Sequence, residues 1–298
     1  MKLLACFPIV LLLAVTGCGS DDSAARGGTV TVVATTTQVA DFTRNVAGSD
    51  VHVVQLLAPN ADPHEYEVRP QDVNAVSGAD LVLRSGGDVD EWLDQAIEGS
   101  GTQAQVVTLS DGVQLNGDDP HWWQDPRNAI AAVDEIRAAL DRADAAHKAD
   151  YDAHAKAYTA RLHELDGQVA ACVDKVPVAQ RKLVTTHDAL GYYARRYGID
   201  VIGAVIPSLS TQGQPSAGDT AKLIKTIRET GVKAIFAESS VNPKVEAAIA
   251  RETGAKVGKA LWADTLGPKG SDGATYIDSI KSNTAALVDG FSGGTVHC

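Results

Sequence analysis

The stretch from residue 145 to residue 175, AAHKADYDAHAKAYTARLHELDGQVAACVDK, is the longest proline-free segment with a helical pattern. Its apolar residues recur every three or four positions, the spacing of one helix face. The recurring residues are Tyr151, Ala155, Tyr158, Leu162, Leu165 and Val169. About thirty helical residues measure roughly 45 Å. The segment therefore predicts one stiff helix that runs along two lobes and permits little hinge opening between them.

Short β-branched runs alternate with helical patterns on both sides of this helix, which is typical of parallel βαβ units. The predicted strands lie near residues 30–33, 53–57, 81–83 and 106–109, and near 183–185, 201–205, 234–237 and 257–261. The predicted helices lie near residues 40–46, 72–76 and 91–97, and near 190–197, 219–229 and 244–252. We expect an α/β fold in which two lobes, each with a mostly parallel four-stranded sheet flanked by helices, are joined by one long helix.

The N-terminus has the pattern of an exported lipoprotein. Lys2 precedes an apolar run over residues 3–15, and Thr16-Gly17-Cys18 then resembles a bacterial lipobox, whose cysteine is lipidated after cleavage. Residues 19–28 are small and polar, as in a flexible tether. We expect a protein anchored to the cell membrane by lipid and facing the extracellular or periplasmic side. The expected division is 1–17 signal peptide, 18–28 lipidated tether, 29–144 N-terminal lobe, 145–176 linking helix and 177–298 C-terminal lobe.

The composition is that of a folded, well-solvated body. The chain has 298 residues, of which 44% are hydrophobic, and its net charge of -12 disfavours nucleic acid as a partner. Beyond the N-terminal run, no stretch is apolar enough to span a bilayer. We expect a monomer.

Two of the four cysteines are expected to remain, without lipid, after the N-terminal segment is processed. Cys6 is lost with the signal peptide and Cys18 carries lipid, which leaves Cys172 and Cys298. An exported protein permits a disulfide between them, although a cysteine at a chain end is as often frayed as bridged.

The tripeptide Asp-Pro-His occurs twice, ending at His64 and at His121, and a third histidine, His187, follows an apolar run. Proline fixes its own φ and holds the preceding residue extended, so each Asp-Pro pair is a stiff elbow that aims an imidazole. All three histidines follow predicted strands, at the edge where open parallel sheets bind ligands. Neighbouring carboxylates can accept the second ring N–H of such histidines. These carboxylates are Asp62, Asp119 and Asp188.

Three convergent imidazoles predict a metal site that needs a fourth ligand. Glu238 and Asp264 both follow predicted strands of the second lobe, and spacing does not choose between them. Three imidazoles and one carboxylate suit Zn²⁺. A secreted zinc hydrolase, with water as fourth ligand and Glu238 as general base, is the alternative from another class. Trp122 and Trp123 are expected either to fill a core or to line the cleft.

Five segments carry a resemblance to a known family: DPHEYE (62–67), DPHWWQDP (119–126), VTTHDALGYYARRYG (184–198), IFAESS (235–240) and LWADTLG (261–267). Together they resemble the metal-binding lipoproteins of bacterial ABC importers for zinc and manganese, the ZnuA/TroA-like solute-binding proteins. The resemblance covers nearly the whole chain after residue 28. It implies two lobes joined by a long helix and selects Asp264 over Glu238 as the fourth ligand, beside His64, His121 and His187.

The resemblance also implies a function. It implies extracytoplasmic capture of a divalent transition metal and delivery to an ABC permease driven by its ATPase, without enzymatic activity. Histidine instead of glutamate at position 187 favours Zn²⁺ over the harder Mn²⁺. The short segment 110–119 lacks the His- and acid-rich loop of many zinc-specific members, which leaves capture of Mn²⁺ as the alternative. Some relatives have been described as surface adhesins, but nothing in these residues supplies an adhesive surface.

Overall fold

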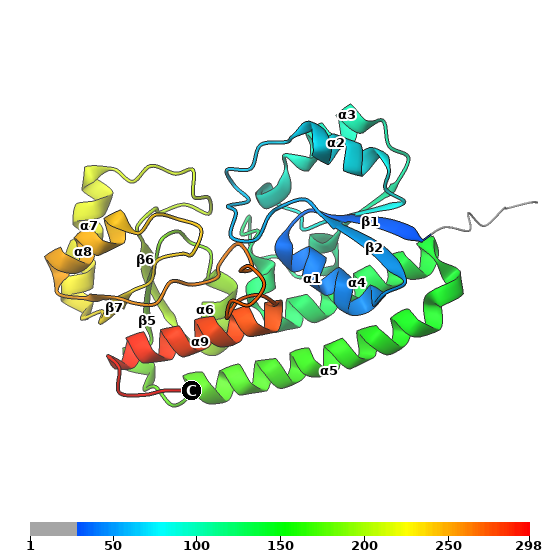
Figure 1. Ribbon diagram of the computed structural model, residues 1–298. Helices are drawn as coiled ribbons and strands as arrows, with labels where there is room; N and C mark the ends of the chain where they lie inside the picture. Colours follow the sequence, from blue (N-terminus) through cyan, green and yellow to red (C-terminus); the bar gives the residue numbers. More distant parts are fainter. Residues whose placement is uncertain (1–28) are drawn as a thin grey trace, which may run out of the picture.

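The computed structural model describes residues 29–298. The expected signal peptide, the tether and its lipidation site Cys18 therefore lie outside the described residues. Two sheet-containing lobes lie side by side above a layer of long helices (Figure 1). The expected α/β fold with its long helix is thus confirmed.

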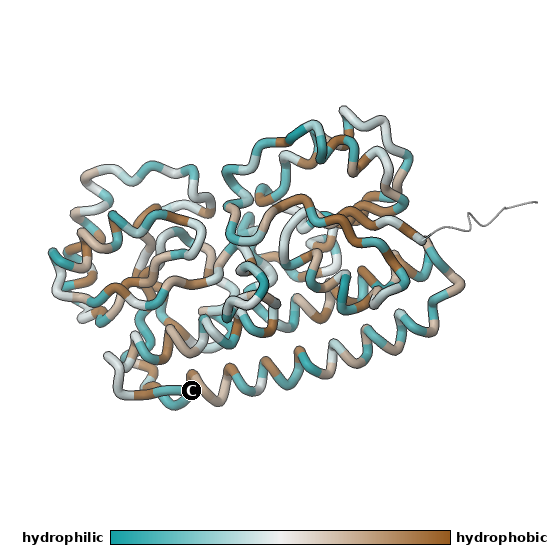
Figure 2. Tube along the Cα trace, viewed as in Figure 1, coloured by the Kyte–Doolittle hydropathy of each residue, from teal (hydrophilic) through white to brown (hydrophobic). Residues whose placement is uncertain are grey.

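The N-terminal lobe contains a four-stranded, fully parallel sheet. Its strands are β1 Val30–Ala34, β2 Val51–Gln55, β3 Leu81–Arg84 and β4 Gln105–Thr108. They lie in the order β2-β1-β3-β4. In the central strand β1, Val32 and Val33 point to opposite faces and neither is exposed. Figure 2 accordingly shows these strands as a hydrophobic band, which is what a parallel sheet covered on both faces requires.

Helices cover both faces of this sheet. They are α1 Thr37–Ala47, α2 Pro70–Ser77, α3 Leu93–Ser100 and α4 Pro126–Ala143. Residues of α1 and α4 share a hydrophobic cluster with Val32, whereas residues of α2 and α3 share a cluster with Val33. The two pairs of helices therefore lie on opposite faces, and the carboxyl edge of the sheet is left to loops.

The C-terminal lobe has four parallel strands, of which the last two are only two residues long. They are β5 Lys182–Thr185, β6 Asp200–Ala204, β7 Ala234–Ile235 and β8 Lys256–Val257. β5 pairs with β6, β7 pairs with β8, and a bridge between Thr185 and Phe236 joins the pairs in the order β6-β5-β7-β8. The helices are α6 Gly191–Tyr197, α7 Ala217–Thr230, α8 Lys244–Thr253 and α9 Tyr276–Ser292. Residues of α7 and α8 pack on the Val184 face of β5, and residues of α6 and α9 pack on its Leu183 face.

The last two strands are shorter than the sequence predicts, because a bulge interrupts their pairing. The N–H of Gly258 donates to the carbonyl of Ile235 at 2.8 Å, and that of Leu261 donates to the carbonyl of Ala237 at 2.9 Å. Between these two hydrogen bonds one strand advances by three residues, from Gly258 to Leu261, while the other advances by two, from Ile235 to Ala237. The extra residue interrupts the regular ladder, and pairing resumes at a bridge between Glu238 and Leu261, just before the segment that carries Asp264.

The linking helix α5 spans Lys148–Val173 and runs beneath both lobes (Figure 1). Its predicted apolar stripe, from Tyr151 to Val169, is buried. This stripe belongs to one hydrophobic cluster that also contains residues of α1 and α4 from the first lobe and of α6 and α9 from the second. The lobes therefore share a core at their base. The lobe boundaries expected near residues 145 and 177 stay a prediction.

Two helices of this base, α4 and α9, are absent from the sequence analysis. The buried side of α4 combines alanines with Val133, Ile136 and Leu140 at helical spacing, so this helix is amphipathic. Helix α9 is buried around most of its surface, including Ser279 and Asn283, so only a narrow row of exposed residues, with Asp278, Lys281 and Asp289, marks its solvent side. Further signals were the N-caps, since Asp125 and Thr275 each accept a backbone N–H of the first turn.

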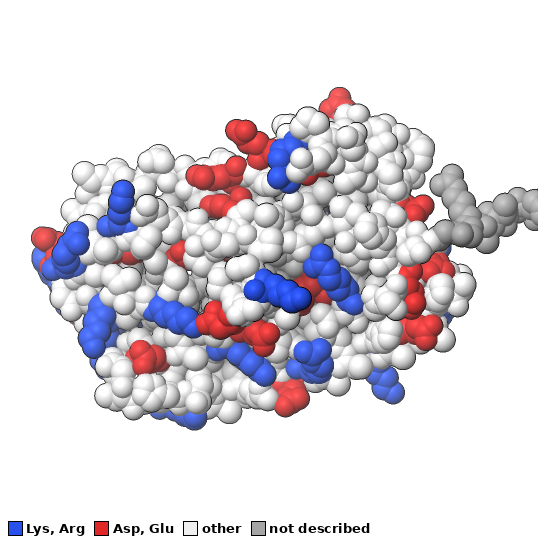
Figure 3. All heavy atoms as spheres, in the orientation of Figure 1, with Lys and Arg blue, Asp and Glu red and all other residues white. Residues whose placement is uncertain are grey.

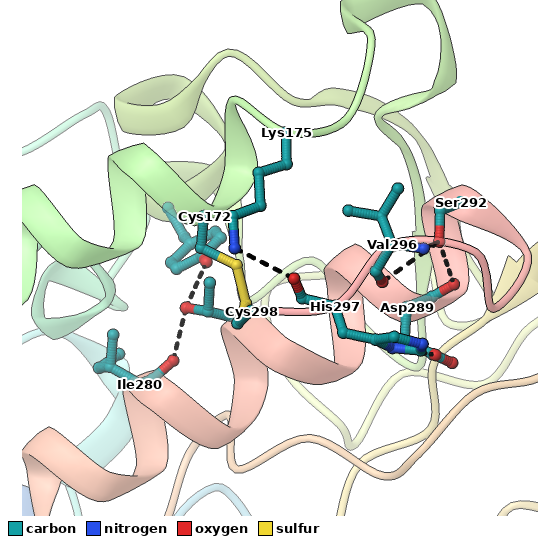
Figure 4. The surroundings of a disulfide bond; sticks show 10 residues. Cys172, Lys175, Ile280, Asp289, Ser292, Val296, His297 and Cys298 are labelled. Atoms are coloured by element: carbon teal, nitrogen blue, oxygen red, sulfur yellow. Dashed lines mark hydrogen bonds and ion pairs between the residues drawn. A yellow bond between two sulfur atoms is a disulfide. The ribbon is translucent and has the colours of Figure 1, made fainter.

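A disulfide fixes the end of the chain to α5. Cys172 and Cys298 are bonded, with their Cα atoms 5.3 Å apart (Figure 4). Lys175 donates from Nζ to the carbonyl of His297 at 3.1 Å, and Nδ1 of His297 lies 3.3 Å from Oδ1 of Asp289 on α9. The C-terminal cysteine is therefore bridged, and the ends of α5 and α9 are tied together.

Charged side chains are interspersed over the face drawn in Figure 3, where lysines and arginines alternate with acidic residues. One such pair is Lys259 with Asp272, between the end of β8 and the loop before α9. Within residues 29–298, no helix combines the length and the hydropathy needed to cross a membrane.

Candidate metal centre

Four side chains from separate loops meet between the lobes. His64 follows β2, His121 precedes the short 3-10 helix Trp122–Gln124, His187 follows β5 and Asp264 follows β8. Their candidate ligand atoms all lie within 4.8 Å of one another. All four residues are buried, and the most exposed of them, His64, keeps 8% of its accessible surface. The structure therefore brings together the four residues that the family resemblance selects.

Asp264 lies at the centre of this cluster. Its Oδ2 is 3.2 Å from Nε2 of His187 and 3.5 Å from Nε2 of His64. Its Oδ1 is 3.5 Å from Nε2 of His121, which is itself 3.3 Å from Nε2 of His187. All three imidazoles thus turn the same ring nitrogen toward one carboxylate. Three nitrogens and a carboxylate oxygen gathered in this way are a donor set that suits tetrahedral Zn²⁺.

Each Asp-Pro-His elbow is closed by its own aspartate. The carboxylate of Asp62 accepts the backbone N–H of His64 at 2.9 Å, and that of Asp119 accepts the backbone N–H of His121 at 3.0 Å. Such a turn, in which a side chain bonds the backbone two residues on, fixes the loop without help from a regular element. The repeated tripeptide is therefore a local device for orienting a histidine.

Carboxylates also hold the second ring nitrogen of two of the histidines. Nδ1 of His121 lies 2.8 Å from Oδ1 of Asp119, and Nδ1 of His187 lies 2.6 Å from Oε1 of Glu238. The carboxylate that bonds Nδ1 of His187 is therefore that of Glu238, and not that of the neighbouring Asp188. Donation from Nδ1 leaves Nε2 of each ring free to bind a metal and raises its basicity. Glu238 lies on the far side of His187 and is outside the four-residue cluster.

The charges in the cluster stabilise one another. Burial alone would lower the pKa of His187, but the charges of Asp264 and Glu238 raise it well above its ordinary value. Burial opposes ionisation of Asp264, yet the charges of His187 and His121 hold its pKa well below the usual range. Burial also lowers the pKa of His64, and the hydrogen bond to Asp264 outweighs this and raises it. Protons therefore compete with a metal cation for these ring nitrogens.

Gln124 is a buried contact of the site that the sequence analysis does not single out. Trp122 fills the core of the N-terminal lobe, whereas Trp123 lies edge-on to His121 with ring centroids 5.4 Å apart. Trp123 and Gln124 both donate to the backbone carbonyl of Ala263, next to Asp264. The available signal was the position of Gln124 directly after the histidine and two tryptophans.

Comparison with known proteins agrees with this geometry. Residues 32–290 match the family described as ZnuA, zinc-uptake complex component A, periplasmic. The chain belongs to this family. It is 30% identical over 298 residues to the manganese-binding lipoprotein MntA of Halalkalibacterium halodurans, covering 96% of this chain and 98% of the relative. It is 33% identical over 285 residues to MntA of Bacillus subtilis, covering 91% of this chain and 92% of the relative.

A solved structure is similar throughout. The periplasmic zinc-binding protein TroA of Treponema pallidum superposes with a TM-score of 0.82 at 28% identity, covering 89% of this chain and 99% of TroA. Members of this ZnuA family are metal-binding substrate-binding proteins of ABC importers rather than enzymes, and they act with a permease and an ATPase.

The carboxylate of Asp119 is expected to contribute to metal affinity through His121. Replacing it (Asp119→Ala) removes the partner of Nδ1 and the closure of the elbow, so Zn²⁺ affinity should fall about 10- to 100-fold. A titration against a chromophoric chelator measures this change. The matched control is Asp118→Ala, since Asp118 is exposed. An unchanged affinity in Asp119→Ala would contradict the role given to this carboxylate.

Proposed function

We propose that this chain captures Zn²⁺ outside the membrane and delivers it to an ABC permease. His64, His121, His187 and Asp264 are the proposed ligands, and the metal is cargo rather than a resident cofactor. The observation that carries the proposal is the convergence of these four buried side chains on one point, with all candidate ligand atoms within 4.8 Å of one another. Binding of a cation explains why three imidazoles turn Nε2 toward one buried carboxylate.

The donor set is the reason for proposing Zn²⁺ rather than Mn²⁺. Imidazole nitrogen suits zinc, whereas manganese prefers carboxylate, carbonyl and water oxygens. Three of the four proposed ligands are imidazoles, and the fourth is a single carboxylate. The relatives include proteins named for manganese and for zinc, so the choice depends on the ligands of this chain. Capture of Mn²⁺ by the same four residues is the second candidate, because the two MntA relatives are both named manganese-binding.

The proposal also covers the membrane anchor, the oligomeric state and the lobe boundaries of the protein. We propose that Cys18 is lipidated, that residues 18–28 tether the lobes to the outer side of the cell membrane, and that the protein acts as a monomer. The proposed division into a lobe over 29–144, a linking helix over 145–176 and a lobe over 177–298 places two ligand-bearing loops in each lobe. The relatives named as lipoproteins support the anchor.

A zinc hydrolase built on the same histidines is disfavoured by the position of Glu238. The carboxylate Oε1 already accepts both the backbone N–H of His187 at 3.1 Å and its Nδ1 at 2.6 Å. These contacts hold Glu238 behind His187, on the Nδ1 side of the ring and outside the four-residue cluster, rather than beside the position of a metal-bound water. In addition, Asp264 lies beside the three imidazoles, in the fourth ligand position that a catalytic zinc site leaves to water.

Removal of a proposed ligand should abolish tight binding. His187→Ala is expected to lower Zn²⁺ affinity at least about 100-fold, more than the loss of a hydrogen-bonding partner behind a ligand. Competition with a chelator of known affinity measures the constant. His163→Ala is the matched control, because His163 lies exposed on α5. If His187→Ala bound zinc as tightly as the unaltered chain, the proposed site would be wrong.

The preference for zinc should depend on the third imidazole. Replacing it by a carboxylate (His187→Glu) gives an oxygen-richer site, so the ratio of Zn²⁺ affinity to Mn²⁺ affinity should fall. The ratio, and not either constant alone, is the informative quantity, since zinc binds more tightly than manganese at most nitrogen and oxygen sites. A ratio that is unchanged or higher in His187→Glu would remove the basis for preferring zinc.

A further inference from the structure

The segment that carries Asp264 changes its hydrogen-bonding partners along its length. Leu261 is still paired within the C-terminal lobe: its N–H donates to the carbonyl of Ala237, and its carbonyl accepts the N–H of Ser239, each at 2.9 Å. At Trp262 the partner is Asn283 of α9, whose side-chain amide bonds both the N–H and the carbonyl at 2.8 Å. Up to this point the C-terminal lobe and the base hold the chain.

From the next residue onward the partners belong to the N-terminal lobe. The carbonyl of Ala263 accepts two hydrogen bonds, at 3.0 Å from Nε1 of Trp123 and at 2.7 Å from Nε2 of Gln124. Both donors are buried, and together they use both lone pairs of this oxygen. Ala263 is the residue immediately before Asp264, so its peptide plane sets the direction of that side chain.

The residues after Asp264 are held from the same side. The N–H of Asn60 donates to the carbonyl of Leu266 at 2.9 Å and to Oγ1 of Thr265 at 3.1 Å. The N–H of Leu266 donates to Oγ1 of Thr37 at 2.8 Å. Asn60 and Thr37 belong to the N-terminal lobe, so Asp264 is bracketed before and after by contacts with that lobe.

His187 is held differently. Its N–H and its Nδ1 both bond Oε1 of Glu238, and its carbonyl accepts the hydroxyl of Thr185 at 2.7 Å. The next N–H along the chain, that of Asp188, donates to the carbonyl of Ser208 at 3.0 Å. These partners all lie in the C-terminal lobe.

We propose that Trp123 and Gln124 are positioning residues for Asp264, so that the N-terminal lobe, which carries His64 and His121, also orients a ligand that belongs to the C-terminal lobe. The inference rests on the proposed function, because it concerns how that site is held. Asp264 belongs to the C-terminal part of the sequence, but the residues that orient it, Trp123 and Gln124, belong to the N-terminal lobe. His121 and the two residues that orient Asp264 are consecutive apart from Trp122, so one short loop sets both ligands. His187 is the ligand that the C-terminal lobe both carries and orients.

A double-mutant cycle with Asp264 tests this proposal. Gln124→Leu keeps the volume and removes the donor, so Zn²⁺ affinity should fall about tenfold, the lower end of the loss typical of residues behind a ligand. In the Asp264→Ala background, where three imidazoles still bind zinc measurably, Gln124→Leu should have no further effect. Trp123→Phe, which removes the indole donor together with part of the ring's volume, should likewise lower the affinity only while Asp264 is present, and Trp122→Phe matches it for the change in volume.

The control variant is Trp122→Phe. This neighbouring tryptophan is equally buried, but its Nε1 donates to the carbonyl of Ser85 within the N-terminal lobe. Its effect on affinity should be the same with and without Asp264. An unchanged affinity in Gln124→Leu, or an equal loss in both backgrounds, would overturn the positioning role. Wild-type affinity in Asp264→Ala would instead overturn the proposed function, so the two failures are distinguishable.

Discussion

The arrangement of the whole site depends on one buried carboxylate, Asp264, being surrounded by three imidazoles. A carboxylate in such a place is costly unless it is paired, and here three Nε2 atoms lie 3.2 to 3.5 Å from its oxygens. Asp264 and His187 accordingly shift each other's pKa in opposite directions, downward for the acid and upward for the imidazole. A divalent cation that displaces protons from this pocket keeps the charge balanced, which makes the pocket a site for metal capture.

The fold provides this cluster by placing two parallel sheets side by side, with the loops at their carboxyl edges supplying the proposed ligands. Beneath the cleft, α5 joins residues of both lobes in one hydrophobic cluster, and the disulfide of Cys172 and Cys298 ties α5 to the chain end after α9. A shared core of this kind resists wide separation of the lobes. We therefore expect uptake and release to involve the ligand loops more than a large hinge motion.

The sequence predicts the three histidines well because their signals are local. Asp-Pro-His describes a closed elbow, and strand patterns place each imidazole at a sheet edge. The fourth ligand is harder to predict, because Glu238 and Asp264 both follow strands. The bulge that precedes Leu261 has no signature in composition either. The pairing of Glu238 with His187 and of Gln124 with Ala263 joins positions 51 and 139 residues apart, which local patterns do not reveal. The helical spacing of Ala129, Val133, Ile136 and Leu140 was available in the sequence to predict α4, whereas α9 is buried around most of its surface and shows only a narrow polar row.

The most direct test is X-ray absorption spectroscopy of the zinc-loaded protein, because it reports the coordination shell itself. We expect a four-coordinate ion with three imidazole nitrogens and one carboxylate oxygen, all at about 2.0 to 2.2 Å. The same spectrum for Asp264→Ala should show the carboxylate replaced while the imidazoles remain. A shell with fewer than three imidazoles, or one completed by water in the unaltered protein, would contradict the claim that these four side chains close around the metal.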